Sequence, residues 1–157
     1  MQQKQLSRFL MAAGLLASMG VIFVFVVAAP VLLAQMVPEW QSSPVFWVRL
    51  LYLCPIAALY LSALWQYMGV CQRIGNNRSF CAENARALEG MAKRLFITAG
   101  LWLLYPVLQA VLGRLSRLIF PSLLLFLGSL AMGMLALGLG RLLTRVVRLQ
   151  EENDLTI

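Results

Sequence analysis

Histidine is absent from this chain of 157 residues, and only six residues are aspartate or glutamate. The chain therefore lacks the side chain that most often serves as a general base or metal ligand near neutral pH. Charged residues make up 12% of the sequence and hydrophobic residues 61%, whereas soluble domains average about 25% charged and about 45–50% apolar residues. A chain this short has too much surface to hide that apolar excess from water. The composition excludes an ordinary soluble domain and indicates a membrane protein.

Cysteine is also scarce, and its spacing excludes two further classes. Cys54, Cys71 and Cys81 are the three cysteines, and no two of them form a CxxC pair. An odd number without a framework of pairs argues against a disulfide scaffold, and the ligand set of a metal site is missing. The net charge of +7 lies at the edges of uncharged stretches, which fits lipid headgroups better than nucleic acid. We expect no metal, no cofactor and no nucleic-acid binding.

Four long stretches without charge are what the sequence does contain. The spans we expect are 9–37, 50–71, 95–113 and 118–140. Each reaches the length of about 20 residues that a helix needs to cross the hydrocarbon core, where every backbone amide requires an internal partner. The first stretch is longer than the core of a signal peptide, so we expect a retained helix. The pattern predicts an all-α fold: a polytopic, four-transmembrane-helix bundle forming one domain over residues 1–157.

Basic residues are divided unequally between the two sides of such a bundle. With four spans, both termini and the middle connection share one side. That side carries ten basic residues: Lys4, Arg8, Arg73, Arg78, Arg86, Lys93, Arg94, Arg141, Arg145 and Arg148. The other side carries three, which are Arg49, Arg114 and Arg117. Because short cytoplasmic segments carry the excess of Lys and Arg, both termini are predicted to be cytoplasmic.

The spans themselves offer little chemistry. None of the four contains Asp, Glu, Lys, Arg or His, so no general base or charged transport pathway is available at depth. We therefore expect that the protein is not an enzyme. Small residues recur four apart at Ser129 and Gly133, Ala136 and Gly140, and Gly14 and Ser18. This spacing lets helix backbones approach closely; packing within the bundle is the favoured reading and homo-oligomerisation the alternative.

The middle connection carries signals for a helix outside the spans. Gly75-Asn76-Asn77 is a turn and helix-stop signal. Ser79 suits an N-cap, and Glu83 would follow near the positive end of the helix dipole. These features predict a short cytoplasmic amphipathic helix that starts near Ser79 and leads into the third span.

The C-terminal tail is predicted to continue the fourth helix with a basic face. Arg141, Arg145 and Arg148 are spaced three and four apart, and an acidic end with apolar closing residues follows. We expect this tail and the middle connection to be the interacting part of the chain. The candidate interaction residues are Ser79, Phe80, Glu83, Asn84, Asp154, Leu155 and Ile157.

Two segments resemble a known family. The glycine turn followed by Ser79-Phe80, Glu83-Asn84 and Leu88, together with the terminal Glu-Glu-Asn-Asp-Leu-Thr-Ile, is similar to a bacterial membrane-protein family known as domain of unknown function 2975. The resemblance implies a four-helix inner-membrane protein without assigned activity. Genes of that family often neighbour a small helix-turn-helix regulator, which implies a sensory or regulatory role with a partner.

Two functions therefore remain open at this stage. The first is a non-enzymatic membrane protein, embedded in the lipid bilayer, that presents its cytoplasmic loop and C-terminal tail to a protein partner. The alternative is a subunit of a small oligomeric transporter or channel. Because the spans lack charge, such a transporter would carry neutral or hydrophobic cargo.

Overall fold

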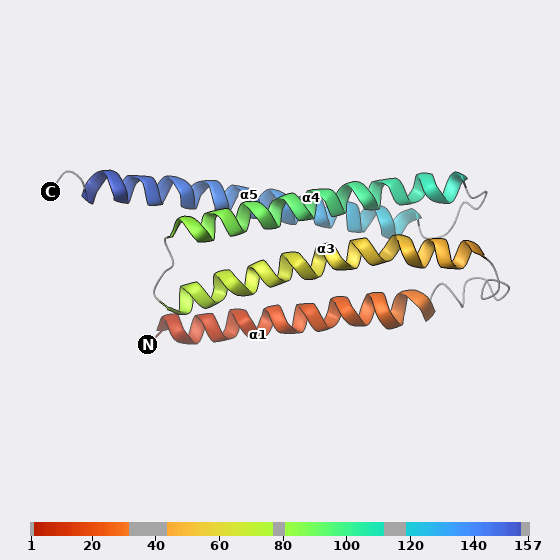
Figure 1. Ribbon diagram of the computed structural model, residues 1–157, viewed down its shortest axis with the longest axis horizontal. Helices are drawn as coiled ribbons and strands as arrows, with labels where there is room; N and C mark the ends of the chain where they lie inside the picture. Colours follow the sequence, from red (N-terminus) through yellow and green to blue (C-terminus); the bar gives the residue numbers. More distant parts are fainter. Residues whose placement is uncertain (1, 32–43, 77–80, 112–118, 155–157) are drawn as a thin grey trace.

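The structure, a computed structural model, describes residues 2–31, 44–76, 81–111 and 119–154 (Figure 1). Its elements are α1 (Gln2–Phe23), the π-helical turn η1 (Val24–Ala28), α3 (Pro44–Gly75), α4 (Ala82–Val111) and α5 (Ile119–Asp154). No strand occurs in these ranges. Four of the helices are long and apolar enough to cross a membrane. The prediction of an all-α, four-helix membrane protein is thereby confirmed.

The helices run beyond the predicted spans because their ends depend on turn residues, not on the loss of hydrophobicity. α3 stops at Gly75, as the turn signal predicted, and the Asn76 amide donates to the Gln72 carbonyl at 3.2 Å. α4 begins where the Cys81 carbonyl accepts from the Asn84 amide at 3.0 Å. The segment before the third span and the span itself form this single helix. Ser79 and Phe80 lie outside the described residues, and the amphipathic character of the first turns stays a prediction.

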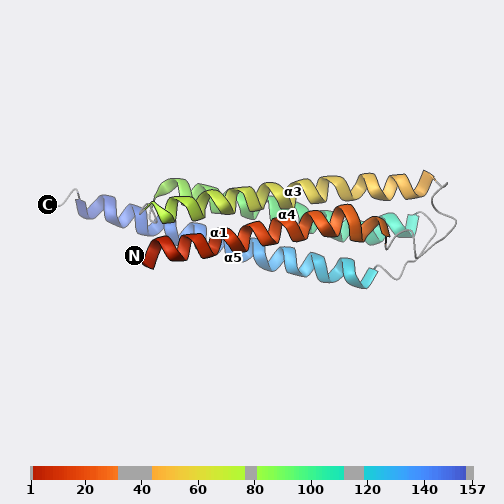
Figure 2. The same cartoon turned by 90° about the horizontal axis from the view of Figure 1, so that it is seen from below.

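The four helices form a bundle that is open along one side. α1 packs on α3, α3 on α4, and α4 on α5, while α1 and α5 make at most marginal contact within the described ranges. The start of α1, the end of α3, the start of α4 and the end of α5 all lie at the same end of the bundle (Figures 1 and 2). This shared end is the one that charge counting predicts to be cytoplasmic, and we call it the terminal end.

The tightest interface joins α4 to α5 through small residues. Ala85, Ala92 and Ala99 recur every seven residues on α4 and are buried. They face a buried stripe of small residues on α5: Ser129, Gly133, Ala136 and Gly140. A Cβ on Gly133 would lie 3.1 Å from the Phe96 ring, and one on Gly140 would lie 3.3 Å from the Ala85 carbonyl oxygen. The prediction that these small residues pack the bundle internally is confirmed.

The start of α1 is fastened to the end of α3 at the terminal end. The buried Ser7 hydroxyl donates to the Cys71 carbonyl at 2.8 Å. This approach needs a glycine at position 75, because a Cβ there would meet the Ser7 hydroxyl at 2.5 Å. About two helical turns further along α1, Gly14 leaves room for the Tyr67 ring, which a Cβ would meet at 3.1 Å. Gly14 therefore also serves packing within the chain, whereas the Ser18 hydroxyl bonds to the Leu15 carbonyl of its own helix.

Candidate functional site

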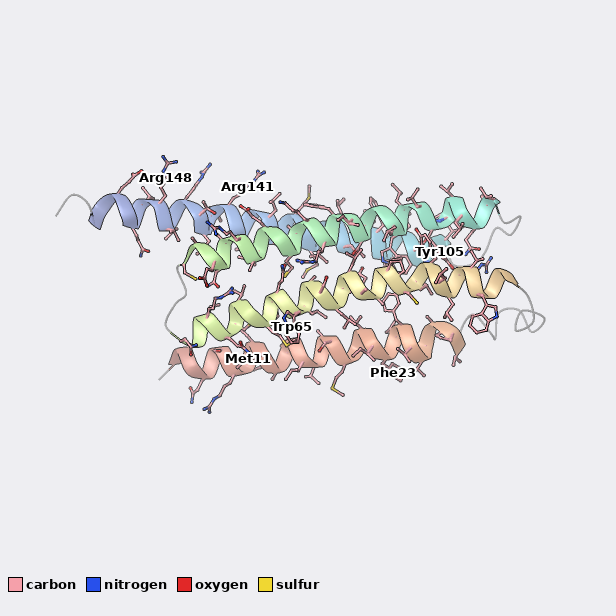
Figure 3. The ribbon with its side chains drawn as sticks, in the orientation of Figure 1. Met11, Phe23, Trp65, Tyr105, Arg141 and Arg148 are labelled. Atoms are coloured by element: carbon pink, nitrogen blue, oxygen red, sulfur yellow. The ribbon has the colours of Figure 1, made fainter. Side chains whose placement is uncertain are left out.

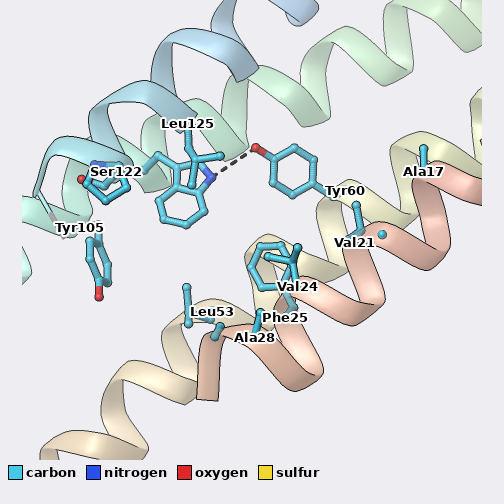
Figure 4. Close-up of a pocket in the computed structure, with 14 residues that line it drawn as sticks. Ala17, Val21, Val24, Phe25, Ala28, Leu53, Tyr60, Tyr105, Ser122 and Leu125 are labelled. Carbon is cyan, nitrogen blue, oxygen red and sulfur yellow. Dashed lines mark hydrogen bonds between the residues drawn. The ribbon is translucent and has the colours of Figure 1, made fainter. Parts of the chain in front are cut away.

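A lateral groove of about 530 Å³ lies between α1 with η1 on one side and α5 on the other, over a floor from α3 and α4 (Figure 4). This volume lies within the range of about 300–1,000 Å³ that is typical of ligand sites. The lining residues are Ala17, Gly20, Val21, Val24, Phe25, Ala28, Ala29, Leu53, Tyr60, Trp102, Tyr105, Pro121, Ser122 and Leu125. Almost all of the lining is hydrocarbon, so the groove suits an apolar ligand.

The groove opens sideways, because its rim is exposed and its floor is buried. On the rim, Val24 of η1 is 51% exposed and Leu125 of α5 is 43% exposed. On the floor, Leu53, Trp102 and Tyr105 belong to the buried core. In a chain that spans a membrane, this opening faces the lipid chains.

The wall formed by η1 departs from regular α-helix. At its end the Ala29 amide bonds back to the Val24 carbonyl, a π-type step over five residues. Pro30 follows directly and has no N–H to donate to the carbonyl of Val26 one turn earlier. π-helical turns of this kind occur frequently at functional sites. The distortion lies at the groove, since Val24, Phe25 and Ala28 all line it.

A chain of hydrogen bonds crosses three helices at the floor of the groove. The Trp102 indole N–H donates to the Tyr60 hydroxyl at 3.3 Å (Figure 4). Ser129 donates its only hydroxyl proton to the Leu125 carbonyl at 2.7 Å. In the bond between Tyr60 and Ser129, Tyr60 must then be the donor. The bonds run in one direction from α4 through α3 to α5, and each hydroxyl both donates and accepts.

Two other buried hydroxyls bond within their own helix. Thr98 donates to the Arg94 carbonyl at 2.8 Å and Ser122 to the Ile119 carbonyl at 2.7 Å. The Tyr52 hydroxyl, in contrast, makes a cross-helix bond to the Leu101 carbonyl in α4.

Arg49 lies in a place that the sequence did not indicate. Counting placed it at the outer edge of the second span, but it lies in the second turn of α3 and is 0% exposed. It interacts electrostatically with Tyr105 across the interface with α4, and the buried Gln109 side chain lies beside the same tyrosine. The predicted span 50–71 contains no charged residue, but the helix that includes it carries a buried charge at Arg49, just before that span. Tyr105 links this cluster to the groove, which it lines.

At the terminal end, two of the candidate interaction residues, Glu83 and Asn84, bond to the same residue of α3. Arg73, near the end of α3, forms an ion pair with Glu83 at 3.3 Å and donates to the Asn84 side-chain oxygen at 3.5 Å. Glu83 and Asn84 lie in the first turn of α4, and Asn84 is fully buried. Arg73 lies just before the helix-stop signal Gly75-Asn76-Asn77, but it was not among the candidate interaction residues. It fixes the start of α4 against α3.

The remaining candidates lie on or beyond the far end of α5. This helix continues past the start of α4 as a projection (Figures 1 and 2), and Arg141 and Arg148 point away from the bundle (Figure 3). Arg148 pairs with Glu152 at 3.4 Å along the helix. Asp154 ends α5, about 21 Å along the axis from Gly140 at 1.5 Å per residue, so the structure does not bring it to Glu83. Leu155 and Ile157 lie outside the described residues.

Comparison with known proteins gives one match. A family model described as protein of unknown function (DUF2975) matches residues 32–157. This range includes α3, α4 and α5 and leaves out α1, which forms one wall of the groove. No curated protein and no solved structure matches the chain significantly.

Proposed function

The chain belongs to the family described as protein of unknown function (DUF2975), and from that premise we propose that it presents its terminal end to a protein partner in the bacterial cytoplasm. In this proposal it is a non-enzymatic, multi-pass protein of the inner membrane. Both termini and the connection between α3 and α4 lie on the cytoplasmic side. The role is regulatory or sensory, in keeping with a chain whose polar residues gather at one end.

The observation that carries the proposal is the projection of α5 beyond the other helices. α5 lies close to α4 at Gly140, which faces Ala85 and Leu88. Fourteen further residues extend to Asp154, with Arg141, Arg145 and Arg148 exposed on them. The uncharged part of α5 up to Gly140 is already long enough to cross the hydrocarbon core. The projection therefore contributes nothing to crossing the membrane and is available for contacts in the cytoplasm.

The start of α4 offers a second, ordered surface at the same end. The bonds from Arg73 to Glu83 and Asn84 hold this turn in place, while the neighbouring Arg86 is exposed. Since a pre-ordered surface loses less conformational entropy on binding, we expect Arg86 and the residues around it to contribute to the partner contact.

The test is site-specific photocrosslinking in cells. A photoreactive amino acid at Arg86 is expected to give one discrete adduct with a cytoplasmic protein. The same amino acid at Leu124, exposed on α5 near the opposite end of the bundle, is the matched control and is expected to give none. The absence of an adduct from Arg86, or the same adduct from both positions, would contradict the proposal.

A second candidate function is favoured by the groove. A cavity of about 530 Å³ with an apolar lining and a lateral opening is suited to a neutral or hydrophobic molecule taken from the bilayer. This would fit either a sensor of such a molecule or a subunit of an oligomeric transporter. The groove-filling variant described in the Discussion tests this candidate independently of any cytoplasmic partner.

A further inference from the structure

The projecting part of α5 carries a row of exposed apolar side chains. Leu142 is 59% exposed, Val146 38% and Leu149 64%. The spacing is four and then three residues, so the three side chains lie on one face of the helix. This face differs from the one that carries Gly140, which faces α4, and from the half-buried Leu143 and Val147. We call Leu142, Val146 and Leu149 the α5 seam.

The seam continues a longer repeat along the same helix. Leu135 and Leu139, both exposed, precede it at the same alternating spacing, and Asn153 stands at the next position of the repeat. Apolar residues that alternate every three and four positions form the a and d positions of a coiled-coil heptad. In this register Leu139, Val146 and Asn153 occupy a, while Leu135, Leu142 and Leu149 occupy d.

Lipid is a poor candidate to cover the α5 seam. The seam lies after Gly140, beyond the uncharged part of α5, and it is interspersed with Arg141, Arg145 and Arg148. α5 continues straight along its axis as it leaves the bundle (Figures 1 and 2), so its side does not lie down on a bilayer surface. An apolar face that projects from a membrane into water is instead covered by another helix.

The residues of the repeat indicate which helix this is. A β-branched residue at a with leucine at d favours parallel two-stranded coiled coils, and the seam has this combination in Val146 at a with Leu142 and Leu149 at d. Two copies of this chain in one membrane share one orientation, so their α5 helices run parallel. We propose that two copies of the chain pair along the α5 seam as a parallel coiled coil.

The flanking charges are compatible with self-pairing. In a parallel pair, each g position faces the e position of the following heptad in the other copy. Arg145 at g then faces Gln150, and Gly138 at g faces Leu143, so no like charges meet. Arg141 and Arg148 occupy c positions, away from the seam. A twofold axis along the membrane normal, the commonest symmetry of homo-oligomers, satisfies this arrangement.

The pairing goes beyond the proposed partner contact and does not depend on it. It would set two copies of the terminal end side by side, each with its own Arg86 surface. A partner that is itself a dimer would then bind through two linked contacts, with the gain in affinity that multivalency gives. The α5 seam itself would be occupied by the second copy.

Disulfide trapping in native membranes tests the pairing with the full-length chain. In a background in which Cys54, Cys71 and Cys81 are replaced by alanine, Val146→Cys and Leu149→Cys are compared with Thr144→Cys and Arg148→Cys on other faces of the same two turns. Only a and d positions bring equivalent Cβ atoms of a parallel pair close enough for a disulfide. We expect more than tenfold more covalent dimer from positions 146 and 149 than from positions 144 and 148.

Equal yields at all four positions would show random collision and overturn the proposal, as would crosslinks from 146 and 149 to a protein of another mass. A second variant tests the pairing without forming a disulfide. Leu142→Arg with Leu149→Arg is expected to weaken dimerisation more than tenfold, measured by light scattering of the purified chain in mild detergent, while Thr144→Arg leaves it unchanged. A wild-type mass of one copy at every concentration tested would equally overturn it.

Discussion

Replacing Gly140 with leucine is expected to abolish stable folding of the purified chain in detergent. A Cβ at this position would already lie 3.3 Å from the Ala85 carbonyl oxygen and from side-chain carbons of Leu88 and Glu89. A leucine adds three further carbons that have no space unless α4 and α5 separate. Overpacking of this kind costs about 1–3 kcal/mol or more, and close approach of backbones is the main source of stability between helices in a membrane. The midpoint of thermal unfolding is measured from the loss of monodisperse elution of the heated protein.

Gly128→Leu is the matched control on the same helix. A Cβ on Gly128 meets nothing within 4 Å, and the residue is exposed. Leucine there should be neutral or stabilising by up to about 1 kcal/mol, because leucine has a higher helix propensity than glycine. Equal stability of the Gly140→Leu and Gly128→Leu proteins would contradict the close packing of α4 against α5.

Filling the groove is the second change with a large expected effect. Gly20 lines the groove from α1, and a Cβ there meets nothing within 4 Å. In Gly20→Phe the ring would occupy the cavity without displacing the backbone. We expect labelling of the purified chain by a photoreactive fatty acid, mapped to peptides containing Tyr60 or Trp102, to fall about tenfold or more, since a filled cavity leaves no volume for an apolar ligand.

Gly100→Phe provides the control for this variant. Gly100 is exposed on α4, lies outside the groove lining, and a Cβ there also meets nothing within 4 Å. The same ring is therefore added to a face of the chain that is open but not hollow. Labelling at Tyr60 and Trp102 that persists in the Gly20→Phe protein, or that falls equally in both proteins, would exclude the groove as a binding site.

The helical layout could be predicted because it follows from local properties of the sequence. Charge-free stretches longer than 18 residues permit only helices in lipid, and Gly75-Asn76 ends α3 where a turn signal predicts it. The close packing at Gly133 and Gly140 was also predictable, since small residues four apart have few other uses in such a helix.

The groove and the Arg49 cluster could not be predicted because both depend on how separate helices are spaced. The groove exists because α1 packs on α3 but stays apart from α5, and no pattern within one helix specifies that gap. Burial of Arg49 depends on Tyr105 and Gln109, which lie more than 50 residues away in the chain. A basic residue at the edge of a span is usually an interfacial one, so nothing in the sequence indicated that Arg49 is buried.

The candidate interaction residues remain a prediction. The sequence did not indicate that Arg73 bonds to Glu83 and Asn84, because this contact appears only when α3 and α4 are placed side by side. The basic face of α5 was recognised from its spacing. The α5 seam was not recognised from the sequence. Leucines that directly follow a membrane span cannot be told from the span itself until the length of α5 relative to the other helices is known.

The cytoplasmic location of the terminal end is the central claim, and cysteine accessibility in spheroplasts tests it most directly. Single cysteines are introduced by Gln5→Cys, Arg86→Cys and Arg148→Cys at the terminal end, and by Ser43→Cys and Ser116→Cys in the two connections on the other side. A membrane-impermeant maleimide is expected to label positions 43 and 116 in intact spheroplasts, and positions 5, 86 and 148 only after the membrane is opened. Labelling of positions 5, 86 and 148 in intact spheroplasts, or opposite results for positions 5 and 148, would contradict the account.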